Sequence, residues 1–340
     1  MKLKKIHIKK YKVFRDFDLE LTHDGEPLDL VVIAGINGSG KTTLFEFIYG
    51  FIHGNKFPGC KVDLLYNKEK NIRGFFGGIP LVFSSDLRNN LYYLETSTYN
   101  KNEAKKQIAE YIDKLIYEGD IKSSQAYQKV QKILNSFFDG FDLQIEFNGL
   151  DKKREVYFKN EYSEKISISE LSTGEQELIT KAFTLYLADI KDSVILIDEP
   201  ETSLHPNWQN KIIKVYEDFA KANNNQVIIA THSPHIVGSA PKESIRVLIK
   251  NEDTIDVISD FDGSYGWEIQ KVLLEIMGSE SLRTPDIEVK ISELKSLLFD
   301  NKYENQEFIK LMNELVNVLG FNDPDLSLIR LEMAKRKSGK

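Results

Sequence analysis

The sequence predicts an α/β fold, because two short apolar strands are each tied to a helical pattern. The first apolar run, 28–34, ends at a glycine-rich turn that leads into helical residues 41–51. The second, 194–197, ends in two acids and follows a helical pattern over 178–189. Strands that alternate with helices in this way are typical of α/β proteins.

Further strands are expected around the first turn. Apolar and polar residues alternate over 6–8 and again over 17–21, so each segment is typical of a strand with one buried face. Residues 53–78 are rich in Gly, Asn and Lys and are interpreted as loop. Short strands are expected at 81–83 and 91–94.

The middle of the chain changes character. Apolar residues recur at helical spacing over 102–118 and 123–138, which predicts two helices too short for a long coiled coil. Strict alternation over 141–147 then predicts a strand. An Asn-Gly turn and a second strand at 156–158 complete a predicted hairpin.

The last part is expected to be mostly helical. A helix over 207–220 precedes a buried strand at 227–230, and the pattern beyond about residue 260 is helical to the end. Asp323 before Pro324 is typical of an N-cap with proline in the first helical position.

The composition narrows the class of protein. The 340 residues carry 45 Lys and Arg against 52 Asp and Glu, a net charge of −7, which argues against a dedicated DNA-coating protein. The single cysteine, Cys60, cannot close an intrachain disulfide. No apolar run approaches the roughly 20 residues of a membrane span, and no signal peptide is evident. A cytoplasmic protein without membrane contact is expected.

The glycine-rich turn matches the P-loop pattern, in the strand–loop–helix context that phosphate binding requires. Its glycines let backbone N–H groups turn toward a phosphate, and Lys41 would contact the β- and γ-phosphates of ATP. The Thr42 hydroxyl would ligate Mg²⁺. The candidate ATP-binding residues here are Gly35, Ile36, Asn37, Gly38, Ser39, Gly40, Lys41, Thr42 and Thr43.

The acidic strand supplies the second half of the predicted site. Asp198 and Glu199 follow the buried strand at its carboxyl end, where α/β proteins bind ligands. Asp198 is expected to hold Mg²⁺ with Thr42, and Glu199 to orient or deprotonate the attacking water.

Three further segments resemble the motifs of one branch of P-loop proteins. Leu171–Gln176 is similar to the signature motif of ABC-type ATPases, Glu201–Pro206 to the D-loop, and Thr231–Pro234 to the switch histidine segment. Over about 1–260 the chain thus resembles ABC-type ATPases of the RecF/SMC/OLD-like group. The resemblance implies an ABC-ATPase P-loop fold, with a mixed central sheet flanked by helices and an antiparallel β subdomain. A helical insertion and a helical C-terminal extension would be added to it.

The resemblance also implies a homodimer, or a higher oligomer built from dimers, with composite ATP sites. The signature of one subunit would reach the nucleotide on the partner's P-loop, through Ser172, Thr173, Gly174 and Glu175. With one P-loop and one signature per chain, a two-fold dimer is the simplest closed assembly.

The remaining site residues are also carried over from the family. His232 would contact the γ-phosphate and act with Glu199 and Lys41 in catalysis, and Lys12 occupies a position where the family often has arginine near the nucleotide. No glutamine fits the family's Q-loop, so Ser84 or Asn90 is considered for that place.

The layout most resembles the small ATPases of Septu and certain retron anti-phage systems, which act beside a separate HNH nuclease. An ATP hydrolase without its own nuclease domain is therefore expected, as the regulatory subunit of such a complex. A DNA-repair or DNA-clamp ATPase and a non-hydrolysing ATP-switch scaffold remain alternatives. DNA contact through the basic N-terminal strand stays open, since lysines also protect solvated edge strands.

The expected domain organisation follows from these assignments. Residues 1–95 form the N-terminal part of the ATPase core and 96–140 the helical insertion. Residues 141–260 complete the core, and 261–340 form the helical extension. The extension is either a cap over a sheet edge or a docking surface for the nuclease.

Overall fold

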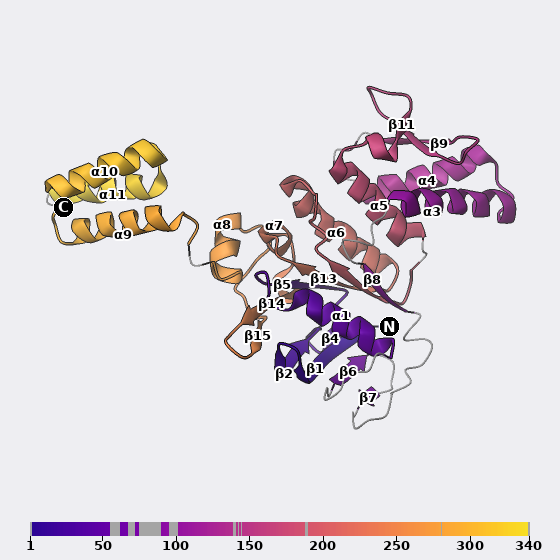
Figure 1. Ribbon diagram of the computed structural model, residues 1–340, viewed down its shortest axis with the longest axis horizontal. Coiled ribbons are helices and arrows are strands. Elements are labelled where there is room, and N and C mark those ends of the chain that lie inside the picture. The colour runs from indigo at the N-terminus through magenta and orange to yellow at the C-terminus, as the bar shows by residue number, and fades with distance from the viewer. Residues whose placement is uncertain are drawn as a thin grey trace. The chain divides into compact units, whose positions relative to one another are not determined.

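The structure is a computed structural model of the chain (Figure 1). It divides into two compact units, Met1–Met277 and Gly278–Lys340. The division falls later than residue 261, where the sequence suggested that the C-terminal extension begins. The described residues are 2–54, 62–66, 72–74, 90–94, 101–138, 141, 143, 145–187, 190–279 and 281–338.

A six-stranded mixed sheet forms the centre of the first unit, as the sequence predicted. Its strand order is β15-β14-β5-β13-β12-β8. Five strands run parallel and β15 is antiparallel to β14. The strands are β5 (Leu30–Ala34), β8 (Leu91–Leu94), β12 (Val194–Asp198), β13 (Gln226–Thr231), β14 (Ile245–Lys250) and β15 (Ile255–Ile258).

Helices cover both faces of this sheet (Figure 1). Val32 of β5 points into a core shared with α5, α6 and α7, while Val31 and Ile33 point into a core shared with α1. Because both faces of the sheet are buried, its central strands are apolar throughout and do not alternate between apolar and polar residues. The helices are α1 (Lys41–Ile52), α5 (Thr173–Leu187), α6 (Pro206–Ala222) and α7 (Pro234–Gly238).

An antiparallel sheet of order β2-β1-β6-β7 forms the β subdomain, next to α1. Two of its strands fall in the segment 53–78 that the sequence analysis interpreted as loop, so that interpretation was wrong for them. The strand expected at 81–83 lies outside the described residues. The strands are β1 (Leu3–Tyr11), β2 (Phe14–Glu20), β6 (Val62–Tyr66) and β7 (Ile72–Gly74), with a small hairpin of β3 (Thr22–His23) and β4 (Glu26–Pro27).

Two helices, α3 and α4, pack against α5, and a three-stranded sheet packs against these two helices. The two helices expected in the middle of the chain are confirmed, and the first ends in a π-helical turn, Lys114–Glu118. The predicted hairpin is present, but its first strand begins at Glu146 rather than 141. The elements are α3 (Lys101–Asp113), α4 (Ser123–Phe138), β9 (Glu146–Leu150), β10 (Val156–Lys159) and β11 (Ile166–Ser167).

The second unit holds three helices around a core of its own, α9 (Pro285–Phe299), α10 (Gln306–Leu319) and α11 (Pro324–Lys337). Leu294, Phe308 and Leu315 are buried in that core. The Asp323 side chain accepts hydrogen bonds from two N–H groups of the first turn of α11, which confirms the predicted cap. Across the described residues, no helix is both long and apolar enough to cross a membrane.

Candidate nucleotide-binding site

The carboxyl ends of three neighbouring strands meet at one edge of the central sheet. The register pairs Ala34 of β5 with Thr231 of β13, and Ala230 of β13 with Asp198 of β12. The P-loop, the switch histidine segment and the acidic pair therefore leave the sheet side by side. This edge is where open α/β sheets bind ligands.

Three glycines shape the loop between β5 and α1. Gly38 and Gly40 have φ angles of 81° and 93°, a left-handed conformation that glycine adopts without strain. A Cβ on Gly35 would lie 2.6 Å from the Ser39 hydroxyl oxygen and 2.8 Å from the carbonyl oxygen of Leu248. Larger side chains are therefore excluded at Gly35, and the loop keeps its tight path.

The Lys41 ammonium lies inside this loop. It donates hydrogen bonds to the carbonyl oxygens of Gly35, at 2.7 Å, and Ile36, at 3.1 Å. Burial lowers the pKa of Lys41, while nearby carboxylates, with Glu199 the strongest, act in the opposite direction. A buried cation whose hydrogen bonds go to neutral carbonyls is well prepared to bind an anion.

The Ser39 hydroxyl gives a second observation on ligand fit. It is fully buried in the loop and has no hydrogen-bond partner within the described part of the chain. Buried polar groups of this kind need an explanation, and a bound ligand is one of them. Together with the loop's N–H groups and Lys41, the residues present fit a phosphate.

Thr42 and Asp198 are brought together from two motifs. The Thr42 side chain lies close enough to the Asp198 carboxylate, which is buried at the end of β12, to lower its pKa through hydrogen bonding. Burial raises the pKa of Asp198, and the hydrogen bond from Thr42 opposes that shift. A hydroxyl beside a carboxylate is the oxygen donor set that Mg²⁺ takes in P-loop proteins. The described residues contain no group of three or more His, Cys, Asp or Glu placed to hold a metal ion. The proposed Mg²⁺ site does not require such a group, because it uses one hydroxyl and one carboxylate.

Sequence reasoning missed Tyr93 on β8. Its hydroxyl lies 3.4 Å from Asp198 Oδ2, so a second side chain helps to orient this carboxylate. The contact exists because β8 pairs with β12 and places Tyr93 opposite Leu196. A lone tyrosine in a short apolar strand carries no sequence pattern that would have revealed it.

Glu199 and His232 face each other across the edge. The distance from His232 Nδ1 to Glu199 Oε1 is 3.3 Å. Glu199 has a φ of 47°, and its N–H donates to the carbonyl oxygen of Ala230. Strained backbone of this kind is concentrated at functional sites, and here it holds a half-exposed carboxylate beside the P-loop edge.

The four signature residues open α5. The Ser172 N–H donates to Glu175 Oε2 at 2.7 Å, and the Glu175 N–H donates to Ser172 Oγ at 3.3 Å, which together form a capping box. A Cβ on Gly174 would lie 2.8 Å from the ring of Trp208. Thr173 is exposed. No hydrogen bond or ion pair between described residues joins these four to the P-loop of the same chain.

The structure does not bring the three weaker sequence candidates, Lys12, Ser84 and Asn90, into the site. Lys12 pairs with Glu46 of α1, with 3.4 Å between Nζ and Oε2, rather than with the phosphate loop. Asn90 immediately precedes β8, and since β8 is parallel to β12 it sits at the opposite edge of the sheet from the site. Ser84 lies outside the described residues.

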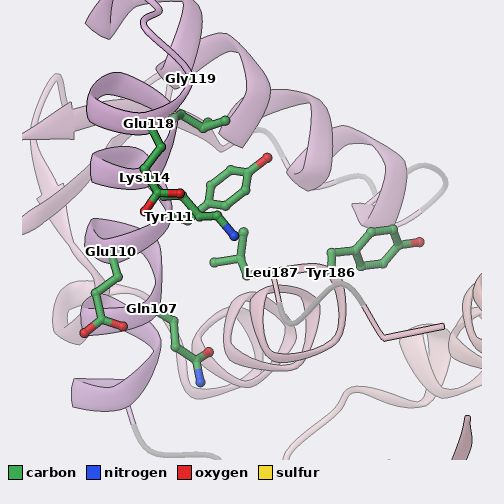
Figure 2. A pocket seen from close by; sticks show the side chains of 9 residues that line it. Gln107, Glu110, Tyr111, Lys114, Glu118, Gly119, Tyr186 and Leu187 are labelled. Atoms are coloured by element: carbon green, nitrogen blue, oxygen red, sulfur yellow. The ribbon is translucent and has the colours of Figure 1, made fainter. Parts of the chain in front are cut away.

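A cavity of about 670 Å³ lies apart from this edge, between α3 and the end of α5. Figure 2 shows the Lys114 side chain directed into it beside Tyr111, with Tyr186 on the opposite wall. None of the residues predicted for the nucleotide site lines it. The P-loop edge, where the predicted site residues gather, is therefore the candidate nucleotide site rather than this cavity.

Fold and site together define a P-loop ATPase of the AAA/ABC type. The chain belongs to the family described as "AAA domain, putative AbiEii toxin, Type IV TA system", whose model matches residues 65–238. A model described as "AAA ATPase domain" matches residues 1–76. The SMC head domain from Thermotoga maritima shares the fold, with a TM-score of 0.52 and 17% sequence identity, over 77% of this chain and 100% of that one.

Two curated relatives are similar in sequence. Retron Ec83 probable ATPase of Escherichia coli is 29% identical over 228 residues, which are 63% of this chain and 40% of that protein. Septu protein PtuA of Bacillus thuringiensis is 30% identical over 149 residues, 42% of this chain and 36% of that protein. The matches thus span less than half of the length of these relatives.

Proposed function

We propose that this protein is a Mg²⁺-dependent ATPase that binds and hydrolyses ATP at composite sites in a dimer. The observation that supports this most directly is the single sheet edge that unites the P-loop, the Thr42–Asp198 pair and the Glu199–His232 pair. The edge thus offers a candidate residue for binding the phosphates, for holding the metal and for activating water.

The residues divide the work as follows. The loop from Gly35 to Thr43 cradles the phosphates with its N–H groups, and Lys41 neutralises their charge. Thr42 and Asp198 hold Mg²⁺, whose chemistry when bound is to neutralise charge on the transferred phosphoryl group. Glu199 orients the attacking water and accepts its proton, because its carboxylate is the half-exposed one at the edge.

The signature would act in trans. Ser172 caps α5 and Thr173 to Glu175 form its first turn. The capping box uses the N–H groups of Ser172 and Glu175, which leaves those of Thr173 and Gly174 to meet an anion. Because Gly174 packs against Trp208, the backbone of that turn lies close against α6 and keeps a fixed direction. A two-fold dimer would bring this turn to the partner's P-loop and give two equivalent sites.

The biological role we propose is the cytoplasmic ATP-dependent regulatory subunit of an anti-phage complex with a separate HNH-type nuclease. The similarity to proteins named for a retron and for Septu supports this role. The DNA-clamp alternative has less support, because Lys5 and His7 on β1 face the acids Asp18 and Glu20 of β2, which reduces the basic character of that strand. The third alternative is a non-hydrolysing switch, which would bind ATP tightly without turnover.

The decisive experiment mixes two inactive variants. Lys41→Ala disables a subunit's own P-loop, and Ser172→Arg disables its signature. In a mixed dimer one composite site is intact, so the mixture should regain about a quarter of wild-type turnover. Each variant mixed with wild-type protein controls for subunit exchange. Chelation of Mg²⁺ should abolish turnover. A mixture that stays inactive despite subunit exchange argues against sites shared between subunits.

A further inference from the structure

We propose that Glu201 positions the switch histidine, His232, whereas Glu199 orients the attacking water and accepts its proton. This inference rests on the proposed function, since it assigns a role within the same ATP site. The inference assigns different roles to Glu199 and Glu201, whose carboxylates lie in one turn and both approach the His232 imidazole. His232 Nδ1 lies 3.3 Å from Glu199 Oε1 and 3.5 Å from Glu201 Oε1.

Burial distinguishes the two acids. The side chain of Glu199 is 37% exposed, and that of Glu201 is 5% exposed. Water can reach Glu199 directly, whereas Glu201 is shielded from it. A general base must lie within reach of the proton that it takes, so the buried acid is poorly placed for that task.

The contacts of Glu201 show what it holds. Its Oε1 accepts a hydrogen bond from the Thr231 hydroxyl at 2.6 Å and another from the His232 N–H at 2.9 Å. Charge-assisted bonds of this length are the stronger kind. The carboxylate therefore fixes the backbone of the histidine itself, at the last residues of β13.

Further hydrogen bonds tie the residues after His232 to the start of α7 and to α6. Thr231 Oγ1 accepts a hydrogen bond from the Ser233 N–H at 2.9 Å, and Ser233 Oγ caps the start of α7. The Ser233 hydroxyl also donates to Gln209 Oε1 on α6 at 2.6 Å. The histidine thus sits in a short segment that is held on both sides.

Lys181, a buried lysine of α5, holds the turn that carries Glu201. Lys181 Nζ donates to the carbonyl oxygen of Pro200 at 2.8 Å, and its side chain is 1% exposed. Burial lowers the pKa of Lys181, and attraction to Glu177 and Glu201 opposes that shift. A buried cation thus holds the turn that carries the buried carboxylate.

The test compares Glu201→Gln with Glu201→Ala. Glutamine keeps an oxygen for both donors, whereas alanine removes the acceptor. Alanine should lower kcat for Mg-ATP about 10- to 100-fold with KM changed less than about twofold, as is typical when an outer-shell support is lost. Glutamine should keep kcat within about threefold of wild type. Equal loss in both variants would show that the charge itself acts, and unchanged turnover in alanine would show no role; either result overturns the proposal.

A second readout does not depend on turnover. In the chain without nucleotide, amide hydrogen exchange over 226–236 should accelerate about tenfold or more in Glu201→Ala and stay near wild type in Glu201→Gln. Should the wild type bind but not hydrolyse ATP, the proposed activity fails while this contrast still decides the positioning. Equal exchange in both variants contradicts it.

A second pair of variants avoids the cavity left by alanine at a buried site. Thr231→Val removes one donor to Glu201 and Thr231→Ser keeps it. Valine should lower kcat and speed exchange over 226–236, while serine should do neither beyond about twofold. If valine and serine behave alike, the hydroxyl does not hold the segment and the proposal is rejected.

Discussion

Lys41 donates a 2.7 Å hydrogen bond to the carbonyl oxygen of Gly35, six residues before it. The ammonium therefore bridges the two ends of the phosphate loop before any anion arrives.

Replacing Lys41 with alanine should weaken ATP binding at least about 100-fold, because the cation that meets the phosphates is lost. Titration with a fluorescent ATP analogue measures this. Lys9→Ala, an exposed lysine of β1, is the matched control and should bind like wild type. Retained affinity in Lys41→Ala would refute the P-loop assignment.

Glu199→Gln should leave ATP binding intact and reduce turnover at least about 100-fold, since the group that accepts the proton is neutral. ATP should then hold the dimer together, which light scattering after size exclusion with Mg-ATP would detect. Glu252→Gln, in the exposed turn before β15, controls for loss of a carboxylate. Normal hydrolysis by Glu199→Gln would remove Glu199 from the mechanism.

Gly174→Ala should destabilise the first unit by about 1–3 kcal/mol, because the new Cβ would lie 2.8 Å from the Trp208 ring and 3.2 Å from the Ser203 carbonyl oxygen. Denaturant unfolding measures the loss. In a double-mutant cycle with Trp208→Phe, the smaller ring should relieve part of the cost. Strict additivity would show that the two residues do not press on each other.

The second unit should lose stability in acid, in part through Asp325. Hydrogen bonding to Lys295, and then to Arg283, lowers the pKa of Asp325 below its ordinary value. A carboxyl whose pKa is lower in the folded state stabilises at neutral pH, and this contribution is lost as pH falls through the folded pKa. Asp325→Asn should therefore lower Tm at pH 7 and cost little at about pH 2–3. A difference in Tm that stays constant with pH would contradict this origin.

Contiguous motifs were predictable from the sequence, and contacts across the sheet were not. The loop from Gly35 to Thr42 and the Asp198–Glu199 pair are local patterns, because their chemistry needs fixed spacing along one turn. Tyr93 reaches the site through strand register, which leaves no periodic mark in the sequence. Glu201 opens the segment that is similar to the D-loop, but its hydrogen bonds to Thr231 and His232 cross to a different strand end and were not predicted.

Strand boundaries were predicted less well for a physical reason. Phe141 and Ile145 alternate with polar residues, yet they bury their side chains in the main core before β9 begins. Burial sets the alternation, while a strand also needs a partner to pair with. Conversely, β6 pairs with β1 and β7 pairs with β6, in a segment whose composition suggested loop.

The position of β13 between β5 and β12 limits how the chain can vary in length. A one-residue insertion within β13 would turn every following side chain to the other face of the sheet and move His232 out of line with both neighbours. The same insertion in the exposed turn at 251–253 would cost little. Length differences among homologous chains should therefore be absent from β13 and tolerated in that turn.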